Sequence, residues 1–350
     1  MLEESQVIKV RYQKLEKIEK MGIKSYPNDF RPKDRAKYLK EIYQDVPSEE
    51  LEKREQEFSL AGRVMAKREM GKIIFSHIQD ETDKIQILVA KSEISSEDFN
   101  FFKKYVDIGD IIGVKGRIIK TKTGEVTILV KYFKLLTKAL RPLPEKYHGL
   151  RDIELRYRMR YLDLIMNPKV REIFKTRTQI IQYIRDYLIS EGFLEVETPM
   201  MQPIVGGAAA KPFITYHNAL DMNLYLRIAP ELYLKRLLVG GFERVFELNR
   251  NFRNEGVSSK HNPEFTMLEF YEAYATYEDL IKRTEELFYG LALEIKGNPV
   301  IVYQGKEIDL TPPWKRIEFL KALTDLGGIP EEILKDREKI FNFAKEKNIE

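Results

Sequence analysis

Residues 242–255 read FERVFELNRNFRNE, and residues 264–271 read EFTMLEFY. Both stretches alternate between unlike residue types with a period of two, which is typical of β-strands whose faces meet different surroundings. One face of the first stretch carries the apolar residues Phe242, Phe246, Leu248 and Phe252. The other face carries Glu243, Glu247, Asn249, Asn251, Arg253 and Glu255. With residues 256–263 as the loop, the pattern predicts an antiparallel hairpin with one apolar and one polar face.

The polar side of this hairpin has two interpretations. The second stretch places Phe265, Met267, Glu269 and Tyr271 on one face, and His261 lies in the loop. A solvent-exposed face is the usual fate of antiparallel strands. The alternative is a binding site, because an arginine on a rigid strand can bridge a phosphate, an aromatic ring can stack on a purine, and a carboxylate beside a phenol can hold an ammonium. The residue pattern alone leaves both interpretations open.

The N-terminal half has a different texture. Residues 58–67, 73–80, 85–90, 111–118 and 125–136 form short segments rich in β-branched residues, and residues 96–105 read as a helix between the third and fourth segments. This order predicts a five-stranded OB-type barrel, a fold that binds single-stranded nucleic acid by stacking bases above a basic groove. Basic and aromatic side chains for such a groove are Arg63, Lys67, Arg68, Lys72, Phe75 and His77. The alternative is that these are ordinary strand residues.

The remaining segments divide the chain. Residues 1–56 read as a helical extension with an amphipathic helix up to Gly22, residues 57–138 as the barrel, residues 139–167 as a linker, and residues 168–350 as a second domain. Within the linker, four arginines at 151, 156, 158 and 160 fit either a solvated face or contact with a polyanion. The second domain opens with a helix that ends at Gly192 and leads into a predicted strand over residues 193–199.

Composition excludes several kinds of chemistry. The chain has 350 residues, enough for two or three domains, and a net charge of +4 that permits nucleic-acid contact without requiring it. It has no cysteine, and its four histidines lie too far apart for a paired-histidine metal motif. No Walker sequence or G-x-G-x-x-G motif occurs, so neither of these nucleotide-binding loops is present. No membrane-length apolar run occurs either, and we therefore expect a cytoplasmic protein without membrane contact. Carboxylates, arginines and backbone groups must carry any chemistry.

The motifs as a set resemble a known enzyme family. Residues 192–199, GFLEVETP, resemble motif 1 of class II aminoacyl-tRNA synthetases, and residues 252–255 with 261–269 resemble their motif 2. Residues 147–163, 206–213 and 226–236 together resemble the bacterial-type lysyl-tRNA synthetases. The resemblance implies an α+β protein in which an N-terminal five-stranded OB-type anticodon-binding barrel precedes a class II catalytic domain on an antiparallel sheet.

Site residues follow from the resemblance by position. It implies that Arg253 is the catalytic residue that bridges the ATP α-phosphate and the amino-acid carboxylate. It assigns ATP binding to Arg253, Glu255, His261, Asn262 and Phe265, with Phe265 under the adenine. It assigns lysine binding to Gly207, Glu231, Glu269 and Tyr271, and anticodon reading to Arg68, Phe75 and Gln86. The implied substrates are ATP, L-lysine and tRNA(Lys), the implied cofactor is Mg²⁺ with ATP, and the implied assembly is a homodimer formed through the motif 1 region.

Two features depart from the family pattern. Nothing resembles motif 3, and the acidic Mg²⁺ ligands that precede it are also missing, so we expect both to lie beyond residue 350. We therefore expect this chain to bind an anticodon stem-loop but to be inactive alone in forming lysyl-adenylate. Val205 stands where a proline is expected before the glycine pair. A non-catalytic OB-fold RNA-binding protein derived from a synthetase is the alternative, but such a protein has no reason to keep the polar hairpin residues in register.

Overall fold

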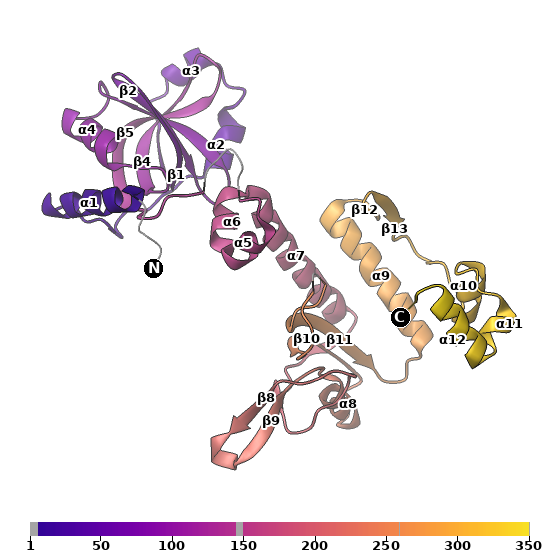
Figure 1. Ribbon diagram of the computed structural model, residues 1–350. Coiled ribbons are helices and arrows are strands. Elements are labelled where there is room, and N and C mark those ends of the chain that lie inside the picture. The colour runs from indigo at the N-terminus through magenta and orange to yellow at the C-terminus, as the bar shows by residue number, and fades with distance from the viewer. Residues whose placement is uncertain (1–5, 145–149, 259, 350) are drawn as a thin grey trace. The chain divides into compact units, whose positions relative to one another are not determined.

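The computed structural model describes residues 6–144, 150–258 and 260–349. The chain forms two compact units, Met1–Pro168 and Lys169–Glu350 (Figure 1). Tyr147 and His148, at the start of one motif used above, lie outside the described residues.

The first unit is built on a closed barrel of five strands in the order β1-β2-β3-β5-β4. The strands are β1 (Glu57–Met70), β2 (Ile73–Gln79), β3 (Lys84–Ala90), β4 (Ile111–Lys120) and β5 (Val126–Thr137), with helix α4 (Ser96–Tyr105) between β3 and β4. Alternate apolar side chains fill the interior, as shown by the complete burial of Ile74, Ile87 and Ile128. The predicted order of three strands, a helix and two strands is confirmed.

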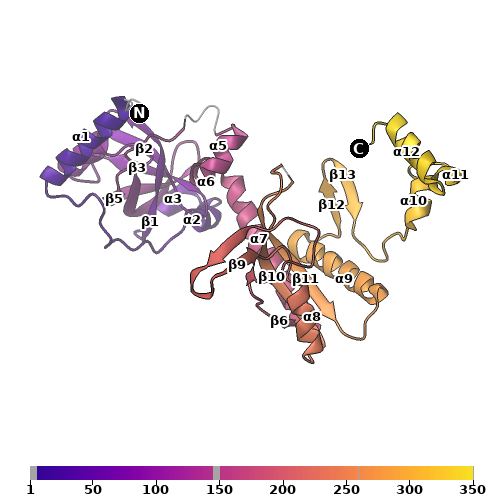
Figure 2. The ribbon, with the colours of Figure 1, turned by 60° about the horizontal axis from the view of Figure 1, so that its bottom comes forward.

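Three helices flank the barrel, with α1 on the side of the N-terminus and α2 and α3 on another side (Figure 2). They are α1 (Gln6–Lys20), α2 (Ala36–Tyr43) and α3 (Ser48–Glu52). Helix α1 is amphipathic as predicted, with Ile18 fully buried and Ile8 and Leu15 half-buried, but Tyr12 is exposed while Arg11 is buried. Arg11 is buried because its guanidinium donates hydrogen bonds to the carbonyls of Ile108 and Ala139, both at 2.8 Å.

The predicted linker is partly folded. Residues 145–149 lie outside the described residues, whereas α5 (Ile153–Arg158) and α6 (Arg160–Met166) belong to the first unit. The Arg156 side chain donates to the fully buried carboxylate of Asp163 at 2.8 Å, and Arg160 donates to the same carboxylate. Two of the four linker arginines therefore neutralise a buried aspartate.

The second unit holds a three-stranded sheet in the order β11-β10-β6. Strands β10 (Arg244–Phe252) and β11 (Glu264–Glu272) form the predicted antiparallel hairpin, and β6 (Leu194–Glu195) pairs with β10 in parallel. The strand predicted over residues 193–199 is therefore much shorter than expected. The cause is that the Thr198 backbone N–H and hydroxyl bind the Glu247 side chain, and Pro199 has no N–H to offer a ladder.

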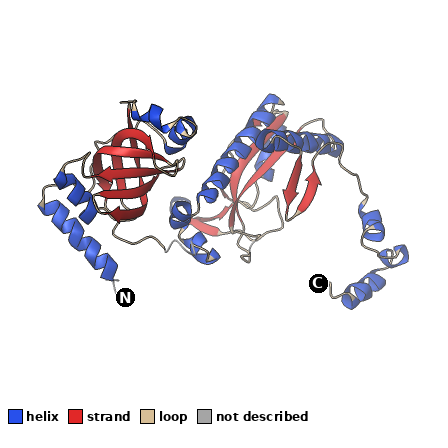
Figure 3. Cartoon of the chain, turned by 90° about the horizontal axis from the view of Figure 1, so that it is seen from above, coloured by secondary structure: helices blue, strands red, loops and turns tan. Residues whose placement is uncertain are grey.

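Two helices pack beside this sheet (Figure 3). Helix α7 (Pro168–Ser190) contributes Leu188 to a small core with Phe193 and Phe246, and α9 (Tyr277–Lys296) packs against α7. The contact includes the Tyr183 side chain of α7, because a Cβ on Gly290 of α9 would lie 1.9 Å from the Tyr183 hydroxyl oxygen. A side chain larger than hydrogen at position 290 would therefore require the Tyr183 side chain to move.

The rest of the second unit surrounds the hairpin or follows it in the chain. A second sheet has the order β7-β9-β8, from β7 (Met201–Gln202), β8 (Ile214–His217) and β9 (Met222–Leu226), and η1 (Asn218–Leu220) lies between the last two. Helix α8 (Glu231–Val239) follows β9 and leads to β10. After α9 come the hairpin β12 (Val300–Tyr303) and β13 (Lys306–Asp309), then α10 (Phe319–Asp325), α11 (Glu331–Leu334) and α12 (Arg337–Glu346).

Candidate active site

Both strands of the β10–β11 hairpin contribute to one polar face. The register pairs Glu247 with Glu269, and Asn251 with Phe265, and directly paired residues share a face. This face is not open to solvent: Glu247 is 3% exposed, Asn249 7% and Asn251 0%. The solvent-exposed interpretation is therefore wrong at the centre of the hairpin. Buried polar side chains require partners, which makes this face a candidate site.

An acidic cluster occupies one end of the face. The Tyr271 hydroxyl donates to the Glu269 carboxylate at 3.0 Å. Burial raises the pKa of Glu269, and the negative charges of Glu231 and Glu247 raise it further, while Arg253 opposes them. Burial and the neighbouring Glu269 charge also raise the pKa of Tyr271. A half-buried carboxylate beside two other carboxylates favours a cationic ligand.

Gly207 lies against the same cluster. It has φ +89°, and a Cβ at this position would lie 2.8 Å from the Cβ of Glu231, the first residue of α8. Only glycine allows this approach without displacement of the helix start. The structure thus brings Gly207, Glu231, Glu269 and Tyr271 together from three separate stretches of the chain.

The other end of the face carries Arg253 and Phe265. The Arg253 guanidinium lies 5.2 Å from the centre of the Phe265 ring, which is cation–π distance. Its Nε atom is buried and has no hydrogen-bond partner among the described residues. Glu255, His261 and Asn262 are exposed in the loop between β10 and β11, where His261 Nδ1 contacts the Ser258 hydroxyl at 2.9 Å. Within the described part of the chain no hydrogen bond joins these three side chains to Arg253.

On the barrel, the three predicted anticodon residues share an outer face. Arg68 pairs with Phe75 across β1 and β2, and His77 pairs with Gln86 across β2 and β3. Arg68 is exposed and Phe75 half-buried, so a base can reach both. The Gln86 amide nitrogen donates to Glu125 at 2.8 Å, and the His77 ring contacts the same carboxylate at 3.0 Å.

Comparisons with known proteins agree with this arrangement. Residues 58–136 match the family described as OB-fold nucleic acid binding domain, and residues 152–348 match tRNA synthetases class II (D, K and N). Lysine–tRNA ligase of Pelotomaculum thermopropionicum is 53% identical over 345 residues, covering 99% of this chain and 67% of that protein. Lysine–tRNA ligase of Carboxydothermus hydrogenoformans is 54% identical, covering 98% and 68%, and that of Wolinella succinogenes is 52% identical, covering 99% and 68%.

The chain belongs to the lysine–tRNA ligase family. It spans about two thirds of the length of these relatives, 67% and 68% for the first two. Membership accounts for the pairing of a nucleic-acid-binding barrel with a class II domain in one chain.

Several residues of this ligase-family site were not assigned a role from sequence. Glu125 immediately precedes β5, and only the parallel pairing of β3 with β5 brings it to Gln86. Arg227 forms a buried ion pair with Glu247 at 2.6 Å, and Thr198 binds the same carboxylate at 2.7 Å. No local pattern marks these partners, because each contact joins segments far apart in sequence.

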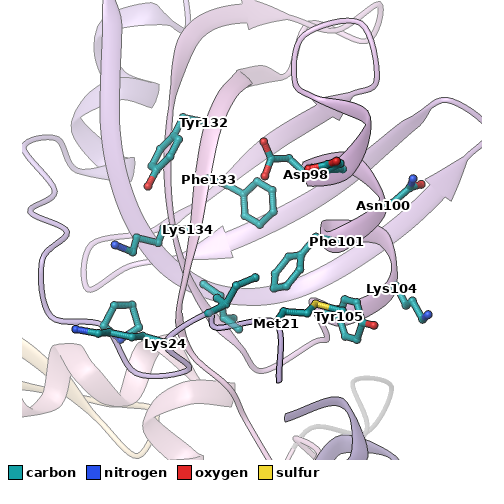
Figure 4. A pocket seen from close by; sticks show the side chains of 14 residues that line it. Met21, Lys24, Asp98, Asn100, Phe101, Lys104, Tyr105, Tyr132, Phe133 and Lys134 are labelled. Atoms are coloured by element: carbon teal, nitrogen blue, oxygen red, sulfur yellow. The ribbon is translucent and has the colours of Figure 1, made fainter. Parts of the chain in front are cut away.

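A cavity of about 790 Å³ lies in the first unit, and its wall does not include Arg68, Phe75 or Gln86. It is bordered by α4, by β5 and by the segment after α1, and Figure 4 shows Phe101, Tyr105 and Phe133 on its wall with Lys24 and Lys134 near its rim. None of the predicted site residues lines it.

The described residues include neither a cluster of metal-binding side chains nor a membrane-spanning helix. Across residues 6–144, 150–258 and 260–349, no group of three or more His, Asp or Glu side chains is arranged to hold a metal ion. Over the same residues no helix is both long and apolar enough to cross a membrane.

Proposed function

We propose that this chain supplies the lysine site and part of the ATP site of an enzyme that activates L-lysine with ATP to form lysyl-adenylate and passes the lysyl group to the 3′ end of tRNA(Lys), and that it does not form the adenylate alone. The observation that carries the proposal is the half-buried Glu269, which accepts a hydrogen bond from Tyr271 and has Glu231 and Glu247 as charged neighbours. Such a cluster favours an ammonium and disfavours a carboxylate side chain. A protein that only binds RNA has no use for this buried charge.

In the first step, a carboxylate oxygen of lysine attacks the α-phosphorus of ATP. An oxygen–phosphorus bond forms, the bond from the α-phosphorus to the bridging oxygen breaks, and pyrophosphate leaves with that electron pair. No protein nucleophile is needed, only alignment of two anions. Arg253 at the end of β10 is the group proposed to bridge them, and its fork of N–H donors suits two anionic oxygens.

In the second step, a terminal hydroxyl of tRNA attacks the lysyl carbonyl carbon. The ester bond to the tRNA forms, the hydroxyl loses its proton to solvent, and AMP leaves with the oxygen that joined it to the acyl group. We assign Glu269 and Tyr271 to the lysine ε-ammonium, and Gly207 and Glu231 to the α-amino group. Phe265 would stack on adenine, while Glu255, His261 and Asn262 would complete ATP binding from the loop.

ATP is proposed to bind with Mg²⁺. Among the described residues no group of three or more His, Asp or Glu side chains is arranged to hold a metal ion, and no step is assigned to the metal.

Amino-acid-dependent ATP–pyrophosphate exchange in the full-length protein tests the proposed reaction. The matched family covers proteins designated D, K and N, so aspartate and asparagine are the informative competitors. Lysine is expected to support exchange, and aspartate and asparagine are not. Exchange with aspartate in place of lysine would overturn the proposal.

We further propose that Arg68, Phe75 and Gln86 read the anticodon. Stacking of one unpaired base on an aromatic ring contributes about 1–3 kcal/mol. Phe75→Ala is therefore expected to reduce tRNA aminoacylation efficiency about tenfold or more while leaving ATP–pyrophosphate exchange intact. The measurement compares both activities in the same variant.

Tyr132 provides a matched control for Phe75. It is an aromatic residue on β5 that is 46% exposed and belongs to no proposed site. Tyr132→Ala should leave both activities unchanged. Equal losses in exchange and aminoacylation for Phe75→Ala would show that Phe75 is only a core residue.

We propose that the protein is a homodimer formed through the motif 1 region. In support, α7, the helix that leads into residues 192–199, carries the apolar side chains Ile173 and Phe174, which are 66% and 49% exposed. A second copy would bury them by the symmetric contact typical of dimers. Sedimentation should give a two-chain mass, and Ile173→Glu should shift it toward one chain. A monomeric wild-type protein at micromolar concentration contradicts the dimer.

The proposed domains follow one another along the chain. We propose residues 1–56 as a helical extension, 57–138 as the anticodon-binding domain, 139–167 as the linker and 168–350 as the catalytic domain. We also propose a cytoplasmic location, because ATP and tRNA are available there.

A further inference from the structure

The polar face of the hairpin includes one member of a buried ion pair that the proposed reaction does not use. Arg227 Nη1 and Glu247 Oε1 are 2.6 Å apart, and each side chain is 4% exposed. The second Glu247 oxygen, Oε2, accepts a hydrogen bond from the Thr198 hydroxyl at 2.7 Å. Every part of this carboxylate is therefore bound by a neighbouring group.

Arg227 also connects backbone segments around the site. Its Nε donates to the carbonyl of Arg250 at 2.8 Å, and its Nη1 donates to the carbonyl of Thr198 at 3.0 Å. Its own carbonyl accepts from the Phe252 backbone N–H at 2.9 Å. The segment leading to Glu231 is thus tied to the end of β10, one residue before Arg253.

Glu247 can influence the charge of Glu269 because the two residues lie opposite each other on the hairpin. It is the direct register partner of Glu269 on the same face of the hairpin. Directly opposed side chains of antiparallel strands have Cβ atoms only about 5 Å apart, and like charges there repel. The Glu247 charge is among the causes that raise the pKa of Glu269, after burial and alongside Glu231.

The other groups facing Glu269 come from three elements. Tyr271 on β11 donates a hydrogen bond to it, Glu231 on α8 repels its charge, and Arg253 after β10 attracts it. Glu231 has its own partner in Lys235, at 2.6 Å. Glu247 is the neighbour whose charge is balanced by a fully enclosed cation.

We propose that Arg227 is a positioning residue for lysine selection: by pairing with Glu247 it neutralises the carboxylate opposite Glu269 and keeps Glu269 available, as an ionised group, to the substrate ammonium. This rests on the proposed assignment of Glu269 to the lysine side chain. Arg227 itself does not contact the substrate and acts through Glu247.

Removal of the arginine should change lysine binding in a pH-dependent way. Arg227→Met leaves the Glu247 charge unbalanced, so Glu269 should ionise only at higher pH. In the full-length protein, KM for lysine should rise about tenfold at pH 7, a coupling typical of residues in one charge network. The ratio of the variant's KM to that of wild type should grow as pH is lowered from 8 to 6. KM for ATP should change little.

The double variant Arg227→Met/Glu247→Gln separates charge from structure. It removes both members of the pair, so KM for lysine and its pH dependence should return close to wild type. Arg227→Lys keeps the positive charge and should also keep the wild-type pH dependence. If Arg227→Met fails to fold, the Arg227→Lys variant tests whether the positive charge at this position sets the pH dependence.

Arg283→Met is the matched control. Arg283 pairs with Glu272 at 3.1 Å in the same unit, and the two side chains are 12% and 7% exposed. Its loss should lower the melting temperature without moving the pH dependence of lysine KM. An equal rise of the lysine and ATP KM values in Arg227→Met, without pH dependence and without recovery in the double variant, would overturn the inference. If Glu269→Gln left lysine KM unchanged, the proposed lysine site itself would be wrong.

Discussion

Glu269→Gln is expected to raise KM for lysine more than a hundredfold in ATP–pyrophosphate exchange, with KM for ATP nearly unchanged. The glutamine keeps the shape of the side chain and can still accept the hydrogen bond of Tyr271. It cannot balance the charge of the bound ammonium, and leaving a desolvated charge without its partner costs about 3 kcal/mol, the lower end of the range for buried pairs. The measurement is exchange at several lysine concentrations with ATP saturating.

The same substitution should stabilise the free protein. Because the pKa of Glu269 is raised in the folded state, mainly by burial, the native protein holds this proton more tightly than the unfolded chain. Its ionised form therefore costs stability above the ordinary glutamate pKa of 4.5, and this cost disappears as pH falls below that value. The variant should melt at a higher temperature than wild type at pH 7, and the difference should vanish near pH 4. An unchanged lysine dependence, whatever the melting temperature, would remove Glu269 from the lysine site.

Arg253→Lys should reduce kcat for ATP–pyrophosphate exchange about a hundredfold, and Arg253→Ala about a thousandfold, which is the range for removing one preorganised donor from developing charge. Lysine keeps the positive charge but has neither the planar fork nor the stacking surface that the guanidinium presents to the Phe265 ring at 5.2 Å. The measurement is kcat at saturating lysine and ATP.

Arg250→Lys is the control for Arg253, because Arg250 lies on β10 just before Arg253, is exposed and pairs with Glu264 at 3.3 Å. This variant should have wild-type kcat. A kcat for Arg253→Lys within threefold of wild type would show that Arg253 does not bridge the reacting anions.

Much of the barrel was predictable from the chain alone. Its strands alternate strictly enough that the burial of Ile74, Ser76 and Ile78 on the inner face of β2 follows from a period of two. The helix at Ser96–Tyr105 is marked by Ser95, whose side chain accepts from the Asp98 backbone N–H as an N-cap. Local steric and hydrogen-bond preferences act over a few residues, so a sequence displays them directly.

The second unit was less transparent. The alternation in residues 242–255 correctly predicts a strand, but it cannot tell that the face with Glu247 and Asn251 is as buried as the face with Phe246. The burial of Glu247 depends on Thr198 and Arg227, which lie elsewhere in the chain and donate hydrogen bonds to its carboxylate. For the same reason the strand predicted over residues 193–199 shrinks to Leu194–Glu195, since tertiary contacts take the groups that a ladder would use.

The sequence by itself determined the family, the order of barrel elements, the hairpin and the identity of the side chains proposed to bind lysine and ATP. Each of these depends on residue type and short-range spacing. Only the tertiary structure decided that Gly207 and Glu231 lie together, that Glu247 stands opposite Glu269, and that Arg227 balances the Glu247 charge. Charge interactions depend on distance and burial in three dimensions, and residues 20 to 24 positions apart in the chain reveal neither until it has folded.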